Sequence, residues 1–89
     1  MDQQIASGLK EFISSNYLFG DESRMPADTD SLLETGVLDS TGILELIEFL
    51  EENYGISVED VETVPENLGT LANIARYVTV KLSKTAGAA

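Results

Sequence analysis

The sequence predicts a small all-α bundle, mostly antiparallel, of three main helices plus one short helix and a long first loop. Three observations lead to this fold class. Apolar residues recur at helical spacing in three separate segments, and the segment between the first two has no helical period. The chain of 89 residues also suffices for only one modest core. We therefore expect a single domain.

The first helix is predicted over residues 3–15, ending at Ser14-Ser15-Asn16. Its apolar face follows the i, i+4, i+7, i+8 pattern: Ile5, Leu9, Phe12 and Ile13. Residues 17–38 contain Gly20, Pro26 and Gly36 and read as a long loop. The loop should be packed over one end of the core, because it carries apolar residues that need burial: Leu18, Leu32, Leu33, Val37 and Leu38.

The second helix, residues 40–54, has the clearest pattern. One stripe is apolar: Ile43, Leu46, Ile47, Leu50 and Tyr54. Asp39 is a preferred N-cap, able to accept from the amide of Thr41 or Gly42, and this places Ser40 at the first helical position, facing solvent. Gly55 suits the left-handed position that ends a helix.

The last third of the chain predicts one short turn and one long helix. Residues 59–62 form a possible single turn ended by Pro65. The final helix follows an apolar stripe, with Asn67 or Thr70 as its N-cap: Leu71, Ile74, Ala75, Val78 and Leu82. Residues 83–89 are predicted to be a disordered tail.

The composition excludes several classes of chemistry. The sequence has no His and no Cys, so it encodes no His-based triad, no thiol nucleophile, no disulfide and no zinc site with thiolate or imidazole ligands. Little room remains in so small a domain for a catalytic cavity as well as a core. We expect a protein that is not itself an enzyme.

The net charge of −11 indicates the kind of partner. Residues 25–75 contain twelve Asp or Glu and no Lys or Arg. Such a surface disfavours nucleic acids and anionic membranes and favours basic patches on proteins. No apolar run approaches the roughly 20 residues of a membrane span, and the N-terminus lacks signal-peptide features, so we expect a cytoplasmic protein.

Ser40 is the candidate functional residue. The dipeptide Asp39-Ser40, taken alone, is an ordinary helix start. A solvent-facing serine is a poor nucleophile unless a neighbouring base activates it, and the sequence encodes none nearby. Another enzyme would have to supply the base, which indicates a serine that is acted upon. A phosphate on that hydroxyl would be favoured by the helix N-terminus.

The residues around Ser40 resemble a known family. The stretch GVLDSTGILELI (residues 36–47), continued by EENYGI (residues 51–56), is similar to the phosphopantetheine-attachment region of acyl and peptidyl carrier proteins, and a weaker likeness runs from the first helix to about Leu82. The resemblance implies a carrier domain over residues 1–82 with an acyl-carrier-like fold. It also implies that Ser40 carries covalent 4′-phosphopantetheine, with Asp39 as its neighbour in the motif.

In this family the phosphopantetheine thiol holds the cargo as a thioester. The implied partners are a phosphopantetheinyl transferase, an acyl- or aminoacyl-activating ligase and downstream acyl-processing enzymes, in fatty acid or secondary-metabolite biosynthesis. Fatty-acid carriers mostly read Gly-x-Asp-Ser-Leu, whereas this chain has an extra residue before Asp39 and then Thr41-Gly42. It is closer in motif to stand-alone aminoacyl and D-alanyl carriers. The predicted function is a discrete, monomeric acyl or aminoacyl carrier protein.

The second helix is also the predicted docking surface. Leu44 would be a small apolar anchor within an acidic ring, although a lone exposed leucine needs no function. The ring has no Lys or Arg at i±4 to relieve its repulsion, which favours docking over a merely solvated face: Glu45, Glu48, Glu51 and Glu52.

A bundle of this size leaves room between the second and the last helix to shelter a short apolar chain. The alternative function is an unmodified acidic adaptor that binds a basic partner through the same helix. A third possibility, a calcium sensor, rests on Asp28, Asp30 and Glu34, but the glycine and the distal glutamate of an EF-hand are missing, so no metal site is predicted.

Overall fold

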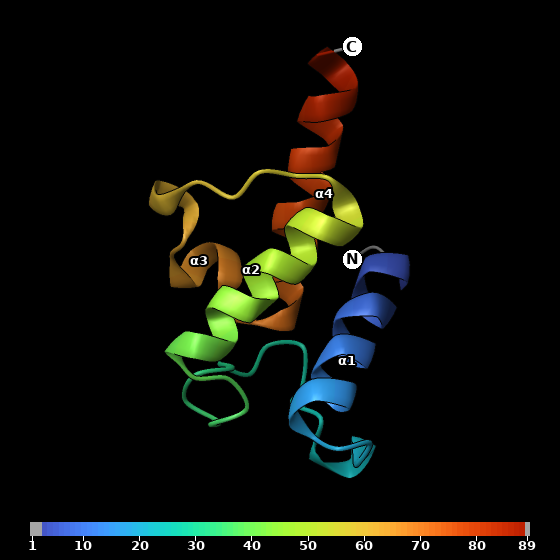
Figure 1. Ribbon diagram of the computed structural model, residues 1–89, viewed down its shortest axis with the longest axis vertical. Helices are drawn as coiled ribbons and strands as arrows, with labels where there is room; N and C mark the ends of the chain where they lie inside the picture. The colour runs from blue at the N-terminus through green and yellow to red at the C-terminus, as the bar shows by residue number, and fades with distance from the viewer. Residues whose placement is uncertain (1–2, 89) are drawn as a thin grey trace.

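Within the described residues the chain forms four α-helices and two 3-10 turns. The computed structural model describes residues 3–88, and the side chains of residues 3–83. The α-helices are α1 (Gln3–Tyr17), α2 (Ser40–Tyr54), α3 (Pro65–Leu68) and α4 (Leu71–Ala88), and the turns are η1 (Glu22–Arg24) and η2 (Asp60–Glu62) (Figure 1). The predicted all-α bundle of three main helices, one short helix and a long first loop is confirmed.

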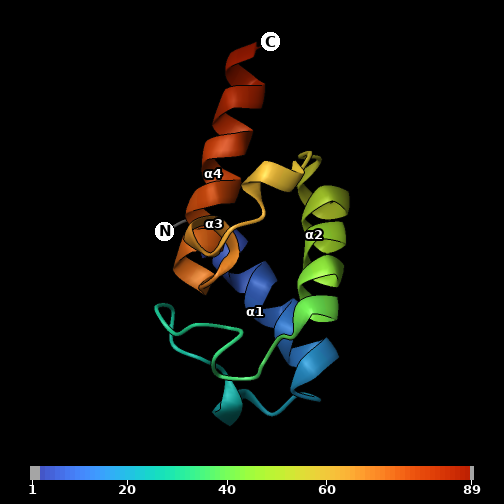
Figure 2. The ribbon, with the colours of Figure 1, turned by 90° about the vertical axis from the view of Figure 1, so that its left-hand side faces the viewer.

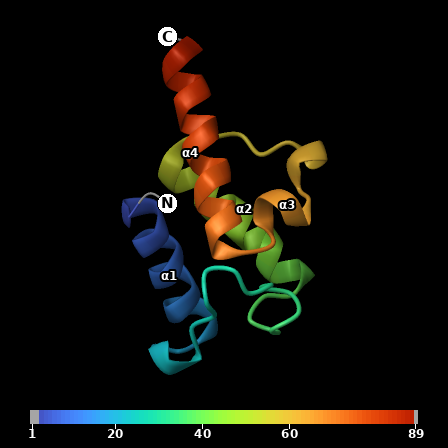
Figure 3. The same ribbon diagram turned by 180° about the vertical axis from the view of Figure 1, so that it is seen from behind.

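Helix α4 is the central element, because it contacts each of the other three helices. Figure 3 shows it in front of α2, with α1 on one side and α3 on the other. Helix α1 is antiparallel to both α2 and α4, whereas α2 and α4 run in the same general direction (Figures 1 and 2). Residues 55–70 return the chain to the end of the molecule where α2 began, so the bundle is less antiparallel than the sequence predicted.

The core lies where the apolar stripes of the three long helices meet. Its fully buried side chains come from every part of the chain and include Leu9, Ile13, Leu32, Leu46, Leu50 and Ile74. Aromatic rings close one side of it, with Phe12 of α1 stacked on Phe49 of α2 at a centroid distance of 4.5 Å. Phe19, in contrast to these two phenylalanines, is exposed.

The first loop is fastened to the core through its own backbone. Leu32 is fully buried, and its amide donates to the carbonyl of Gly69 at 2.9 Å. The amide of Ala72 donates to the carbonyl of Asp28, and the Asp28 carboxylate pairs with Lys10 of α1. The predicted packing of this loop is confirmed, with one correction. Leu33 is 51 % exposed rather than buried, because its neighbour Leu32 takes the inward position.

Two boundaries differ from the sequence prediction. Helix α1 continues to Tyr17, two residues beyond the predicted end, because Tyr17 packs edge-on against Phe12 at 5.8 Å. Pro65 begins α3 instead of ending a turn. Proline is well suited to the first position of a helix, where its missing N–H costs no hydrogen bond. Of the two predicted caps of α4, Thr70 is the one whose side chain accepts from a first-turn amide, that of Asn73.

An ion pair holds the segment before α3 against α4. Lys81 contacts both carboxylate oxygens of Glu62, at 3.0 and 3.3 Å. The backbone hydrogen bond from Glu59 and the bond from Lys81 lower the pKa of Glu62. Asn67 adds a hydrogen bond to the Glu62 carbonyl at 2.9 Å. These contacts hold the segment before α3 against α4.

The C-terminal helix runs beyond its predicted end at about Leu82, since α4 is helical to Ala88. The predicted disordered tail, residues 83–89, falls largely outside the described side chains and stays a prediction. Within the described residues, no helix has both the length and the apolar character that crossing a membrane requires.

Candidate functional site

The start of α2 presents Ser40. Asp39 is extended, with φ −106° and ψ −171°, and its Oδ1 accepts from the Gly42 amide at 2.8 Å. The predicted N-cap is confirmed, with Gly42 as the donor. Ser40 occupies the first helical position and is exposed, as predicted. Among the described residues, no side chain hydrogen-bonds to its hydroxyl.

Gly42 has a structural role that the sequence did not reveal. A Cβ at this position would lie 3.2 Å from Cδ2 of buried Leu38 and 3.4 Å from the capping oxygen of Asp39. The first turn of α2 therefore packs closely on the end of the long loop. This packing holds the first turn of α2, and with it the backbone of Ser40, in place.

Removal of the cap should weaken the start of α2. Asp39→Ala is expected to lower the free energy of unfolding by about 1 kcal/mol, because the Gly42 amide loses its acceptor. Urea denaturation followed by circular dichroism measures the change. Asp39→Asn keeps a side-chain acceptor at the cap, so its loss should be smaller. Equal losses in the two variants would contradict the capping role.

Ser40 begins a row of residues along α2, spaced four apart and inclined to the helix axis. The row, here called the α2 row, consists of Ser40, Leu44, Glu48 and Glu52, and all four residues are exposed. Side chains at i and i+4 lie one above another on a helix, so the row forms one continuous strip of surface. Leu44 is 62 % exposed, which confirms its predicted position on the surface.

The four acidic residues predicted for docking differ in how they are used within the fold. Glu45 accepts from the Tyr17 hydroxyl at 2.7 Å, and Glu51 accepts from the Val58 amide at 2.9 Å. Burial, and next the hydrogen bond to Glu45, raise the pKa of Tyr17 to about 12. Among the described residues, Glu48 and Glu52 have no hydrogen-bond or ion-pair partner. The two carboxylates of the α2 row are therefore the ones left for a partner protein.

An open apolar groove of about 580 Å³ adjoins Ser40, here called the α2–α3 groove. Its lining includes Ile43 and Leu44 of α2, Val64 and Leu68 at α3, and Leu33 of the long loop, with Ser40 on its edge. The expected shelter between the second and the last helix stays a prediction. There the facing side chains of α2, Leu46 and Leu50, are fully buried in the core, and the open space lies on the α3 side.

Leu33 and Val64 are groove residues that the sequence analysis did not identify. Leu33 was expected in the core, and Val64 was not singled out. Both are exposed, at 51 % and 36 %, and both line the groove together with Leu44. The signal available in the sequence was the run of apolar residues around Pro65, which is too irregular to fit a single helical stripe.

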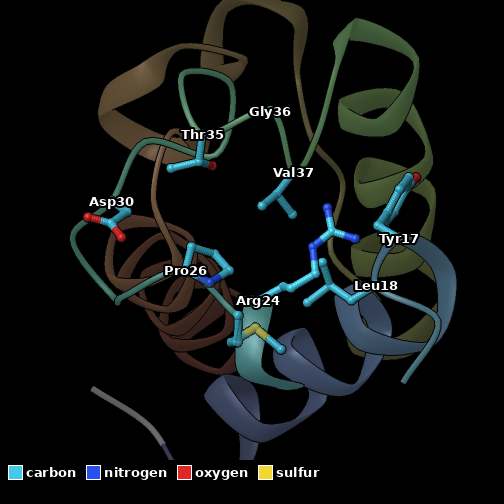
Figure 4. A pocket seen from close by; sticks show the side chains of 9 residues that line it. Tyr17, Leu18, Arg24, Pro26, Asp30, Thr35, Gly36 and Val37 are labelled. Carbon is cyan, nitrogen blue, oxygen red and sulfur yellow. The ribbon is translucent and has the colours of Figure 1, made fainter. Parts of the chain in front are cut away.

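A second pocket, of about 290 Å³, lies between the end of α1, η1 and the long loop. Figure 4 shows Arg24 reaching into it toward Val37 and Tyr17. Ser40 is not part of its lining. The residues of the considered calcium loop are engaged elsewhere, since Asp28 pairs with Lys10 and Asp30 accepts from the Ala27 amide. In the described part of the chain, no three acidic residues are grouped closely enough to share a metal ion.

No protein-family model and no curated protein matches this chain. The function of the site is therefore inferred from its own geometry.

Proposed function

We propose that this protein is a discrete carrier that holds acyl or aminoacyl cargo as a thioester on 4′-phosphopantetheine attached to Ser40. The observation that carries the proposal is the placing of an exposed serine at the capped start of α2, on the edge of an apolar groove. The resemblance of residues 36–56 to carrier proteins supports it. We also propose that the protein is a monomer and that it acts in the cytoplasm.

The surroundings of Ser40 fit a phosphodiester. The hydroxyl is exposed and stands at the N-terminus of a 15-residue helix, where the helix dipole favours an anion. The sequence encodes no neighbouring base, so the transferase would take the hydroxyl proton. The serine oxygen would form its bond to phosphorus as the pyrophosphate bond of coenzyme A breaks, and adenosine 3′,5′-bisphosphate would leave. When bound, the group would supply a thiol for the cargo.

The groove supports cargo with an apolar portion. Its lining is mostly apolar, and it opens directly beside the attachment point. A short chain tethered at Ser40 would exchange water contact for contact with Leu44 and Leu68, which is favourable by about 0.8 kcal/mol for each buried methylene group. The tether itself would raise the concentration of cargo at each enzyme that docks on the α2 row.

The test is intact-mass measurement after incubation with coenzyme A and a broad-specificity phosphopantetheinyl transferase. We expect a gain of one phosphopantetheinyl group, abolished in Ser40→Ala. Thr41→Ala is the matched control, because it removes the neighbouring hydroxyl and should leave the gain intact. No gain in the native sequence, or a gain that persists in Ser40→Ala, would refute the carrier function.

The alternative is an unmodified acidic adaptor that uses the α2 row to bind a basic partner. The carboxylates of Glu48 and Glu52 support this function equally well, since docking requires no modification. The mass experiment distinguishes the two proposals, because an adaptor gains no group under conditions that load a known carrier protein. We prefer the carrier, because an adaptor gives no reason for the serine at the groove.

A further inference from the structure

Phe19 is displayed on the surface in a strained conformation. Its side chain is 89 % exposed, the largest exposure among the large hydrophobic residues of the described chain. Its φ is +53°, the left-handed region that bulky residues rarely adopt. The next residue, Gly20, has a φ of +83°. A polar residue or a second glycine would suit position 19 better, both for solubility and for backbone energy.

The backbone around Phe19 is well fixed. Leu18 is 2 % exposed, and its amide donates to the Ile13 carbonyl at 3.2 Å. The Gly20 amide donates to the Ser14 carbonyl at 3.0 Å, and the Asp21 amide to the Leu18 carbonyl at 2.9 Å. The turn that buries Leu18 therefore directs Phe19 outward. Strained residues that the surrounding structure holds in place are common at functional sites.

This turn belongs to the same end of the molecule as Ser40. The segment after α1 and the start of α2 both lie away from the C-terminus (Figures 1 and 3). Tyr17, two residues before Phe19, hydrogen-bonds Glu45 in the second turn of α2. A protein that reaches Ser40 covers about 800 Å² of this surface in a standard interface. The molecule measures 40 × 25 × 21 Å, so one interface of this size at this end can include both the start of α2 and the turn that carries Phe19.

We propose that Phe19 is a second docking anchor, bound by an apolar pocket with a basic rim on the transferase that modifies Ser40. The inference rests on the proposed carrier function. Aromatic residues are frequent binding hot spots. The turn beside Phe19 carries two acidic residues, Asp21, which caps η1 through Ser23, and Glu22. Its one basic residue, Arg24, reaches into the pocket toward Tyr17 (Figure 4). A second copy of the chain is a poor occupant, because two surfaces of a protein with a net charge of −11 repel each other.

The experiment compares kcat/KM for modification of Ser40 by a broad-specificity phosphopantetheinyl transferase in the native sequence, Phe19→Gly and Val80→Ala. Glycine adopts the left-handed conformation without strain, so Phe19→Gly should fold with a melting temperature no lower than the native value. Its kcat/KM should fall about tenfold, through KM. Val80 is a 45 % exposed apolar residue on α4, and its truncation should leave kcat/KM within about twofold.

The outcomes separate this inference from the carrier function. If the native protein is never modified, the carrier function itself fails. If the native protein is modified and Phe19→Gly is modified equally well, the anchor is refuted and the carrier function stands. If gel filtration shows a dimer that Phe19→Gly dissociates, Phe19 serves self-association and the proposal is overturned. A reduced kcat at unchanged KM would also refute a docking role.

Discussion

Leu46→Ala is expected to lower the free energy of unfolding by about 3 kcal/mol. Leu46 has no exposed surface and belongs to the central core cluster. Alanine at this position loses the transfer free energy of the removed groups and leaves a cavity that the helices fill only partly. For a domain of this size the melting temperature should fall by about 15 °C. Thermal and urea denaturation followed by circular dichroism measure the change.

Leu44→Ala is the matched control for this prediction. It removes the same atoms from the same helix two residues earlier, but Leu44 is 62 % exposed. Its effect on the free energy of unfolding should stay within about 0.5 kcal/mol. In transferase kinetics, Leu44→Ala should lower kcat/KM more than Leu46→Ala does, because Leu44 follows Ser40 in the α2 row. Similar stability losses in the two variants would contradict the described orientation of α2.

The bounds and caps of helix α2 could be predicted from the sequence because their determinants are local. Asp39 caps it through an amide three residues away, and Gly55 ends it with a φ of +67°. Its inward stripe is also largely confirmed, since Leu46 and Leu50 are fully buried. The exposure of Ser40 followed from the same periodicity. These features depend on residues close together in the sequence, where spacing determines position.

The α2–α3 groove could not be predicted, because it depends on contacts between distant segments. The Leu32 amide of the long loop donates to the Gly69 carbonyl, which follows α3, and the neighbouring Leu33 lines the groove together with Ile43 and Leu44 of α2. Gly69 itself is tightly packed, since a Cβ there would lie 2.5 Å from the Pro65 carbonyl oxygen. No periodic pattern in the sequence records such an approach. The exposure of Leu33 and the start of α3 at Pro65 were missed for this reason.

The different structural roles of the acidic residues of α2 could not be predicted from the sequence either. The sequence presents Glu45, Glu48 and Glu51 as equivalent members of one acidic face. In the fold, Glu45 accepts a hydrogen bond from the Tyr17 hydroxyl, and Glu51 accepts one from the amide of Val58, in the segment after α2. Substitutions at these two positions therefore disturb packing between segments as well as surface charge. A clean test of docking has to use the α2 row.

Glu48→Lys is expected to lower kcat/KM for transferase modification about tenfold at low ionic strength, and Glu48→Lys/Glu52→Lys about a hundredfold. A reversed charge replaces attraction to a basic partner by repulsion, which slows association. The single variant should fold normally, since a lysine at position 48 stands four residues from both Leu44 and Glu52 and gains an ion-pair partner. Steady-state kinetics over a range of salt concentrations measure the effect.

Glu11→Lys is the control that separates local docking from overall charge. It changes the net charge by the same amount as Glu48→Lys, but Glu11 is exposed on α1, outside the α2 row. We expect a much smaller loss of kcat/KM from this variant. The deficit of Glu48→Lys should shrink as salt rises, because the Debye length is about 10 Å at 0.1 M. Equal losses in the two variants would mean that the transferase responds to the total charge of the protein, and the docking role of the α2 row would be refuted.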